Sequence, residues 1–357
     1  MDLKLSLDEQ NFRDEIVRFV DRAFPVAVRE NPSAVDEKRW HQAVANQGWT
    51  AVEWSAEFGG PGWKPIEIYL WYTVTLKANC PPADYCGLHV VGPLLQQFGD
   101  PVYHSLHLEN IISHTQTWGN AVFLDGSSIV FHTNVDENYL LQGETPCIAT
   151  SPKIDWVLLL TNTGNARSLF LVDLNLMGMN LVHATGTTNI FRLTLDQVLV
   201  PASCLLGEEG KGLEYLISLM TSFQTVSIVV HLQVALSNLK KVIRQYGLDS
   251  DMEDQLADLE IELDALEVMG LRSTLSGYAA KMPIVTIRGH SLARKISDSF
   301  RDALGYYALP DEHAVAGSNE PPMSLADFKL KSWHTEYLPG CPTGFRQDLV
   351  AKTLLGL

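Results

Sequence analysis

The sequence predicts an α+β protein in which two helical regions flank a β-sheet. Three observations support this order: apolar residues recur at helical spacing near the N-terminus, short β-rich segments occupy the middle, and helical spacing then returns. With 357 residues the chain is too long for one simple core. We therefore expect a multidomain protein with an N-terminal α-helical domain over residues 1–114, a middle antiparallel β domain over 115–207 and a C-terminal α-helical bundle over 208–357.

The N-terminal region opens with a helix-start signal, because Ser6 and Glu9 have the spacing of a capping box. Apolar residues then share one helical face: Phe12, Ile16, Phe19 and Val20. Clusters of glycine and proline divide the following stretch, up to about Ser113, into several helices: Gly59–Gly62, Pro81-Pro82 and Gly92-Pro93.

Beyond about Thr115 the sequence pattern changes to short runs of β-branched and apolar residues. Three of them cover residues 157–161, 169–173 and 189–195, and the turn residues 162–165 separate the first two. Short runs separated by Asn and Gly turns predict an antiparallel sheet.

Helical spacing returns after residues 207–210. Two apolar stripes recur at intervals of three and four: Leu213, Ile217, Met220 and Phe223, and then Met252, Leu256, Leu259, Leu263, Leu266 and Met269. Residues 310–322 contain glycine, serine, asparagine and paired prolines, so a loop is expected there.

Composition and charge argue against several functions. The formal net charge of −16 disfavours a nucleic-acid partner, because phosphate binding requires clustered lysine and arginine. The five cysteines are scattered and form no CxxC pair, so neither a disulfide framework nor a metal site is predicted. The N-terminus has no signal-like apolar region, and no stretch reaches the roughly 18 apolar residues of a membrane span. A cytoplasmic protein without membrane contact is expected.

Four segments resemble the acyl-CoA dehydrogenase family, and together they span the chain. The most specific comprises residues 195–202 and 206–212, which resemble the family's F-D-x-V-x-V-P … L-G-E-x-x-x-G exit from its middle domain. The others are Gly48-Trp49 with 57–60, Val91-Gly92-Pro93 with Phe98-Gly99, and residues 350–357. The resemblance implies a helical domain, a middle β domain and a C-terminal four-helix bundle that act on an acyl-CoA with bound FAD.

Members of this family remove the α-proton of the thioester with a carboxylate base and pass the β-hydride to the flavin. Their flavin cradle usually reads S-E-P-x-x-G-S-D and is followed by W-[ST]-[ST]. At these positions the chain has Phe123-Leu124-Asp125, Ile129-Val130 and Cys147-Ile148-Ala149. The side chains of Ile148 and Ala149 donate no hydrogen bonds. The retained Ser127-Ser128 pair leaves backbone binding of a phosphate open.

The catalytic base is also missing from its two family positions. The C-terminal glutamate corresponds to Gly340, and the alternative position falls within residues 221–225, which contain no carboxylate. No catalytic residue is therefore assigned. We interpret Glu209 and Glu214 as capping or solvated carboxylates, and His231, within an apolar run, as a core histidine.

In this family a neighbouring subunit also contacts each flavin, through R-x-[QT]-F-G and Q-x-x-G-G motifs. Residues 244–247 approximate the first motif and residues 300–305 the second, with Arg301 in place of the glutamine. The resemblance implies these cofactor-binding residues: Arg244, Gln245, Tyr246, Arg301 and Gly305. An arginine at position 301 is suited to bidentate binding of a pyrophosphate. The alternative is that these are only surface or interface residues.

The sequence lacks the motifs of its own flavin site but keeps part of the motifs that contact a neighbour's flavin. This combination resembles the flavin-deficient subunit of heteromeric, α2β2 acyl-CoA dehydrogenases of steroid and cholesterol side-chain degradation. We expect a non-catalytic subunit whose homologous partner, with an intact flavin site, supplies the base and holds most of the FAD and acyl-CoA. Two alternatives stay open: a homo-oligomeric acyl-CoA dehydrogenase with an unrecognised base, and a non-redox binding or scaffold protein on the same fold.

Overall fold

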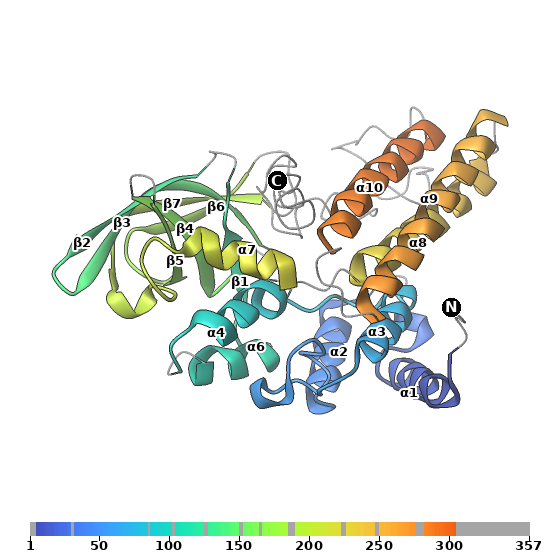
Figure 1. Cartoon of the computed structure of the whole chain (residues 1–357), viewed down its shortest axis with the longest axis horizontal. Coiled ribbons are helices and arrows are strands. Elements are labelled where there is room, and N and C mark those ends of the chain that lie inside the picture. Colours follow the sequence, from blue (N-terminus) through green and yellow to red (C-terminus); the bar gives the residue numbers. More distant parts are fainter. Residues whose placement is uncertain are drawn as a thin grey trace.

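The chain runs through helices, then a sheet, then helices, as the sequence predicts. The computed structural model describes residues 5–29, 32–84, 86–101, 104–124, 128–149, 153–163, 166–184, 190–222, 226–246, 250–275 and 282–304. The strands gather at one end of the molecule and the long helices at the other (Figure 1). Among the described helices, none has both the length and the apolar character needed to cross a membrane.

The first helices surround a core of large aromatic side chains. They are α1 (Leu7–Ala23), α2 (Ala34–Asn46), α3 (Pro65–Lys77), α4 (Gly92–Phe98) and α6 (Glu109–Ile112). Both halves of the predicted capping box form at Ser6, where α1 begins. The rings of Trp40 and Trp71 stack 6.2 Å apart, and Phe19 meets Trp49 edge-on at 4.8 Å. A π-helical turn, Gly87–Val91, leads directly into α4.

In the described part of the chain seven strands form one mixed sheet: β1 (Trp118–Ala121), β2 (Ile129–Val135), β3 (Asn138–Ile148), β4 (Trp156–Thr163), β5 (Ala166–Asp173), β6 (Met179–His183) and β7 (Ile190–Pro201). The order is β1-β4-β2-β3-β7-β6, and β5 pairs with β4. Most pairs are antiparallel, as expected, whereas β1 and β2 run parallel to β4.

Strands β4 and β5 lie between two apolar layers. Leu158, Leu160 and Leu169 pack against α4, α6 and the following helix α7 (Gly212–Ser222), whereas Val157 and Phe170 face the other strands. Helices α4, α6 and α7 lie together along this side of the sheet (Figure 1). Both faces of the hairpin are therefore buried, which explains the continuous apolar run in its sequence.

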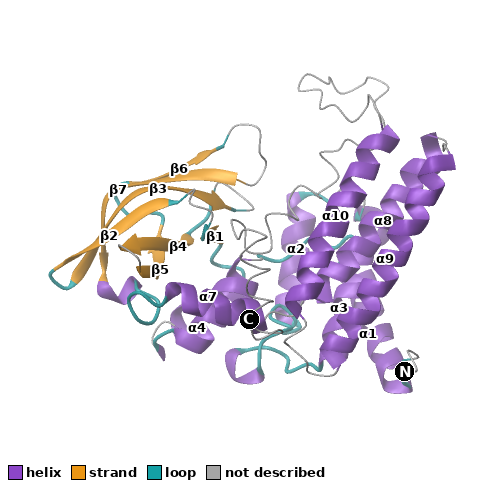
Figure 2. Cartoon of the chain, turned by 45° about the horizontal axis from the view of Figure 1, so that its top comes forward, coloured by secondary structure: helices purple, strands orange, loops and turns teal. Residues whose placement is uncertain are grey.

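The last described helices are α8 (Val226–Tyr246), α9 (Ser250–Leu275) and α10 (Met282–Leu304), which pack side by side (Figure 2). The predicted apolar stripe of α9 faces the bundle, with Leu259, Leu263 and Leu266 buried. The loop expected at 310–322 and the last helix expected near 350–357 lie outside the described residues.

Candidate functional site

A cavity of about 160 Å³ lies where the first helices, the sheet and α8 meet. Helices α2 and α3, with the segment that follows α2, supply an apolar wall that includes Trp40, Trp49 and Trp71. The ends of β1 and β3 supply Asn120, Ile148 and Ala149, and α8 supplies His231. Lysine and arginine are absent from the lining formed by the described residues.

Asp84 is a carboxyl group of this cavity that the sequence reasoning missed. Its Oδ2 accepts the backbone N–H of Trp118 at 3.1 Å, and the N–H groups of Cys86 and Gly87 also donate to the carboxyl group. It thus caps the π-helical turn and ties the helical part to β1. Burial outweighs these hydrogen bonds and raises the pKa of Asp84 to about 7. An aspartate after a proline pair and before an apolar run was the available sequence signal.

A carboxyl group with a pKa near 7 has the proton affinity of a general base. The oxygens of Asp84, however, accept three backbone N–H groups that hold two segments together. We interpret Asp84 as a structural cap on this evidence.

Four histidines also line the cavity. His89 Nδ1 lies 3.3 Å from Glu53 Oε2, and the hydroxyl of Tyr72 donates to the other oxygen of this carboxylate at 2.9 Å. The rings of His41 and His114 lie 4.8 Å apart. Burial lowers the pKa of both, and His41 helps to lower that of His114 to about 4. Both rings are therefore neutral at pH 7.

The charge state of this cavity limits its ligands. Two histidines are neutral, Asp84 is partly protonated at pH 7, and no lysine or arginine of the described residues faces the space. Phosphate groups need cationic or N–H donors, so the cavity suits an uncharged, largely apolar group. His231, which the sequence analysis placed in the core, borders this space.

The positions that correspond to a flavin cradle are apolar in the structure. Cys147 and Ala149 are buried at the end of β3, and Val130 is buried on β2. Leu124 packs against the same apolar cluster as Leu158. The aliphatic side chains have no hydrogen-bond donor, and the thiol of Cys147 donates to the carbonyl of Ile148. The described side chains at the cradle positions therefore do not fit a flavin.

The remaining cradle positions add no clear support for a flavin. Residues 125–127 lie outside the described residues, so binding by Ser127 is untested. The hydroxyl of Ser128 is buried, and no hydrogen-bond partner is found for it among the described residues. The base positions at Gly340 and residues 223–225 also lie outside the described residues.

The residues predicted to reach a neighbour's flavin sit at the ends of two adjacent helices. Arg244 is exposed near the end of α8, which Gln245 and Tyr246 close. Arg301 is exposed in the last turn of α10 and forms an ion pair with Asp298, one turn earlier. Gly305 lies outside the described residues. Their cofactor-binding role stays a prediction.

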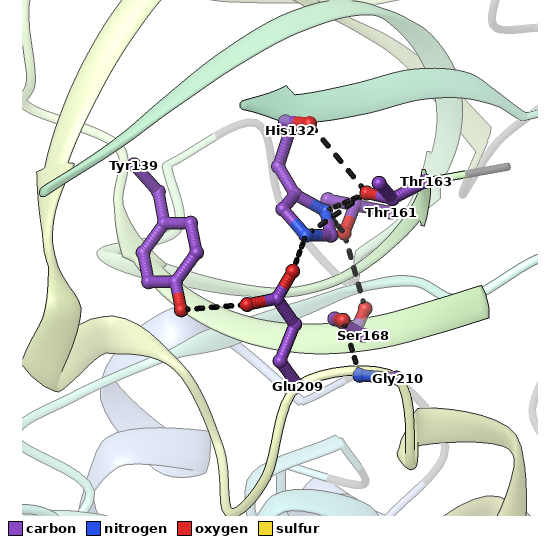
Figure 3. A network of polar contacts seen from close by, with 7 residues as sticks. All are labelled: His132, Tyr139, Thr161, Thr163, Ser168, Glu209 and Gly210. Atoms are coloured by element: carbon purple, nitrogen blue, oxygen red, sulfur yellow. Dashed lines mark hydrogen bonds and ion pairs between the residues drawn. The ribbon is translucent and has the colours of Figure 1, made fainter. Parts of the chain in front are cut away.

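A second polar cluster lies within the sheet, and none of its residues lines the cavity (Figure 3). His132 on β2 is buried, with Nε2 3.2 Å from Glu209 Oε1 and Nδ1 2.8 Å from the hydroxyl of Thr161. Tyr139 donates to the other oxygen of Glu209 at 3.2 Å. A carboxylate only accepts, so Nε2 carries the proton and donates.

This cluster explains Glu209 as a structural residue. The hydrogen bond from His132 lowers the pKa of Glu209, which makes it a weaker base. Together with the hydrogen bond from the Gly210 N–H to Ser168, this contact fixes the loop between β7 and α7 against β2 and β5. Glu214 is exposed at the start of α7. The structure therefore gives no support to either glutamate as a catalytic base.

Comparisons with known proteins agree with this architecture. Residues 6–114 match the family model of the acyl-CoA dehydrogenase N-terminal domain. The chain is 20% identical over 365 residues to acyl-CoA dehydrogenase IpdE1 of Mycolicibacterium smegmatis, covering 92% of this chain and 90% of that protein.

Solved structures show the same fold along the whole chain. A structure of the Tcur3481-Tcur3483 steroid ACAD and one of the ChsE4-ChsE5 complex from Mycobacterium tuberculosis each have a TM-score of 0.78 at 16% identity, covering 100% of this chain and 99% of the other. Butyryl-CoA dehydrogenase from Megasphaera elsdenii has a TM-score of 0.72 at 15% identity, covering 99% of this chain and 100% of the other. These matches confirm the predicted fold class and the resemblance seen in the sequence.

Proposed function

We propose that this chain is the non-catalytic subunit of a heteromeric, FAD-dependent acyl-CoA dehydrogenase. Its residues 6–114 match the N-terminal domain of the acyl-CoA dehydrogenase family, and its fold is that of this family. A homologous partner supplies the base, the isoalloxazine site and the thioester site. This chain supplies the interface and part of the adenosine and pyrophosphate contacts. The assembly desaturates an acyl-CoA.

The apolar cradle carries this proposal. A flavin subunit needs hydrogen-bond donors around the isoalloxazine ring. Here the corresponding side chains include Leu124, Val130, Ile148 and Ala149, of which Val130 and Ala149 are buried. An acyl-CoA dehydrogenase fold without these donors is better suited to assist a flavin subunit than to act alone.

The apolar lining of the cavity and the names of the structural neighbours support an apolar acyl group. The cavity walls are largely aromatic and aliphatic, and its ionisable groups include histidines that stay neutral at pH 7. One structural neighbour is a steroid ACAD, and another is a complex of two differently named chains. A steroid side-chain CoA thioester and an α2β2 assembly fit both observations.

The test is the colour of the purified protein. We expect the chain expressed alone to lack visible flavin absorbance, because its own cradle offers no donors. Co-expression with a homologous subunit that retains S-E-P-x-x-G-S-D is expected to give a yellow complex containing both chains. A stoichiometric yellow protein from this chain alone would instead support the homo-oligomeric enzyme.

A further inference from the structure

The cavity between the first helices, the sheet and α8 is bordered by residues with polar atoms that lack a partner. Thr50 is 7% exposed and lines the cavity, and no hydrogen-bond partner is found for its hydroxyl among the described residues. The same holds for Nε2 of His114, another lining residue, in the described part of the chain. A buried polar atom without a partner destabilises the folded protein. Both atoms are therefore suited to a ligand that completes their hydrogen bonds.

The backbone of His114 gives independent support. Its φ angle of 54° lies in the left-handed region, two residues after the end of α6 at Ile112. Glycine adopts this conformation at little cost, whereas other residues are uncommon there, and their presence at a site suggests a role for the side chain. The ring that histidine adds packs against His41 and borders the cavity. Contact with a ligand is a role that glycine could not fill.

Water is a poor occupant for most of this space. A buried water needs about two to four polar partners, whereas the wall formed by α2, α3 and the segment after α2 is largely aromatic and aliphatic, with Trp40, Trp49 and Trp71 among its residues. A hydrocarbon ligand gains van der Waals contacts along this wall and leaves water itself. The ligand that matches the cavity therefore has a compact hydrocarbon body and few polar atoms.

The polar atoms of such a ligand are uncharged. In the described lining there is no lysine or arginine to pair with an anion. A cation would depend on Asp84, but burial keeps this carboxyl group partly protonated at pH 7, and three backbone N–H groups already donate to it. A hydroxyl such as that of Thr50 and a neutral imidazole such as that of His114 can each donate or accept a hydrogen bond. An alcohol or a ketone matches both residues.

We propose that this cavity binds an uncharged alcohol or ketone with a compact hydrocarbon body, and that Thr50 and His114 bind its oxygen. Two sources offer this chemistry, namely a free molecule and the acyl group of a CoA thioester, and only the second rests on the proposed function. The residues involved all belong to this chain, so binding can be measured without a flavin subunit.

The first experiment titrates the full chain with three adamantane derivatives of matched shape and measures the heat of binding by calorimetry. The probes are 1-adamantanemethanol, adamantane-1-carboxylate and 1-adamantanemethylammonium, which are neutral, anionic and cationic. We expect the alcohol to bind at least about tenfold more tightly than either charged probe, because a charge loses its hydration in an apolar site. Equal or tighter binding of a charged probe, or no binding of the alcohol, would overturn the inference.

Two variants test the named residues. Thr50→Val and His114→Phe replace polar atoms with apolar atoms of similar shape, and each is expected to weaken binding of the alcohol about fivefold. Thr75→Val is the matched control, because Thr75 lines the same cavity and is equally buried, but its hydroxyl already donates to the carbonyl of Trp71 at 2.8 Å. This control is expected to bind the alcohol as the wild type does. If all three variants bind it equally well, the assignment of Thr50 and His114 is wrong.

Thermal unfolding without ligand separates binding from folding. Thr50→Val is expected to be at least as stable as the wild type, since it removes a buried hydroxyl that lacks a partner among the described residues. A clear loss of Tm in this variant would show that the hydroxyl already has a structural partner, and would refute its role in binding.

The two-chain complex distinguishes the two sources of the ligand. If an acyl group reaches the cavity, the CoA thioester of 3-(3-hydroxyadamantan-1-yl)propanoic acid displaces 1-adamantanemethanol. If the ligand is a free molecule, the alcohol stays bound, and either result supports the inference. The proposed function fails separately, through a yellow protein from this chain alone, and that result leaves the titrations of the colourless probes unaffected.

Discussion

Asp84 shows how burial and hydrogen bonding oppose each other at a single residue. Three backbone N–H groups favour its ionised form, whereas removal from water favours the protonated form and prevails. The pKa of Asp84 rises from 3.8 to about 7, so the folded protein holds a proton that the unfolded chain has released over this range. Stability contributed by the protonated group is complete below pH 4 and is lost as the pH rises through 7.

We predict that Asp84→Asn removes this pH dependence. The free energy of unfolding of the wild type, measured relative to the variant, is expected to fall by up to about 4 kcal/mol between pH 4 and pH 7.5. His41 and His114 act in the opposite direction, because their lowered pKa values favour folding as the pH rises, but both proteins contain them. Urea unfolding at several pH values measures the difference, and a constant difference would refute the raised pKa.

Arg301 tests the contribution to a neighbour's flavin, which stays a proposal. Its ion pair with Asp298 is exposed, and such pairs contribute little to folding. A hydrogen bond to a charged group is worth roughly 1.5–3 kcal/mol. Arg301→Ala is therefore expected to weaken flavin binding by the two-chain complex about 10- to 100-fold, with an unchanged catalytic rate at saturating FAD.

The matched control for Arg301 is Arg294→Ala, another exposed arginine on α10. Flavin titration followed by fluorescence gives the Kd, and an artificial electron acceptor gives the rate. If both variants bind FAD as the wild type does, Arg301 is only a surface residue.

At the scale of elements, close packing against one tryptophan explains why two positions in the family-like motifs are glycines. Trp54 is buried and its indole N–H donates to the carbonyl of Leu88 at 2.9 Å. A Cβ at Gly92 would lie 2.0 Å from the ring of Trp54, and one at Gly60 would lie 1.9 Å from its carbonyl oxygen. Both glycines therefore allow the first helices to close around this residue.

Gly92→Ala is predicted to lower the free energy of unfolding by about 1–3 kcal/mol, because the Cβ overpacks a rigid ring. Gly270→Ala in α9 is the control, since its Cβ would make only an ordinary contact of 3.4 Å with Val229. That variant is expected to be neutral or slightly stabilising, because alanine favours a helix more than glycine does. Chemical denaturation of both variants checks the pair, and equal stability would contradict the role of Gly92.

The sequence predicted the elements in which the spacing of apolar residues matches the spacing of buried side chains. Strands β4 and β5 are apolar throughout because both faces are covered, and α9 shows its buried leucines at helical spacing. Strands β2 and β3 were not assigned, since one face is exposed and residues such as His132 interrupt the apolar pattern. Parallel pairing of β1 and β2 with β4 depends on contacts distant in sequence, which periodicity does not reveal.

At the candidate site, only the absence of hydrogen-bond donors for a flavin could be predicted from the sequence. The missing donors at Ile148 and Ala149 follow from residue type alone. The cavity does not, because Asp84, His114 and His231 come from separate helices and loops that tertiary packing brings together. The pKa shifts of Asp84 and His114 are consequences of burial in that packing, so they cannot be read from a short sequence motif.

For the whole molecule, we predict that stability depends on the partner. The bundle of α8, α9 and α10 exposes Ile261 and Val268, and covering such apolar surface stabilises the folded state by mass action. At a partner concentration about 100 times the Kd the gain is roughly 2.7 kcal/mol. This corresponds to a rise of about 4 °C in Tm for a chain of this size.

Thermal unfolding of the chain alone and of the two-chain complex, each at two concentrations tenfold apart, measures this linkage. The Tm of the complex is expected to rise with concentration and that of the isolated chain to stay constant. Ile261→Asp should bring the Tm of the complex toward that of the isolated chain without changing the latter, because the side chain is exposed there. An isolated chain as stable as the complex at every concentration would mean that folding is independent of assembly.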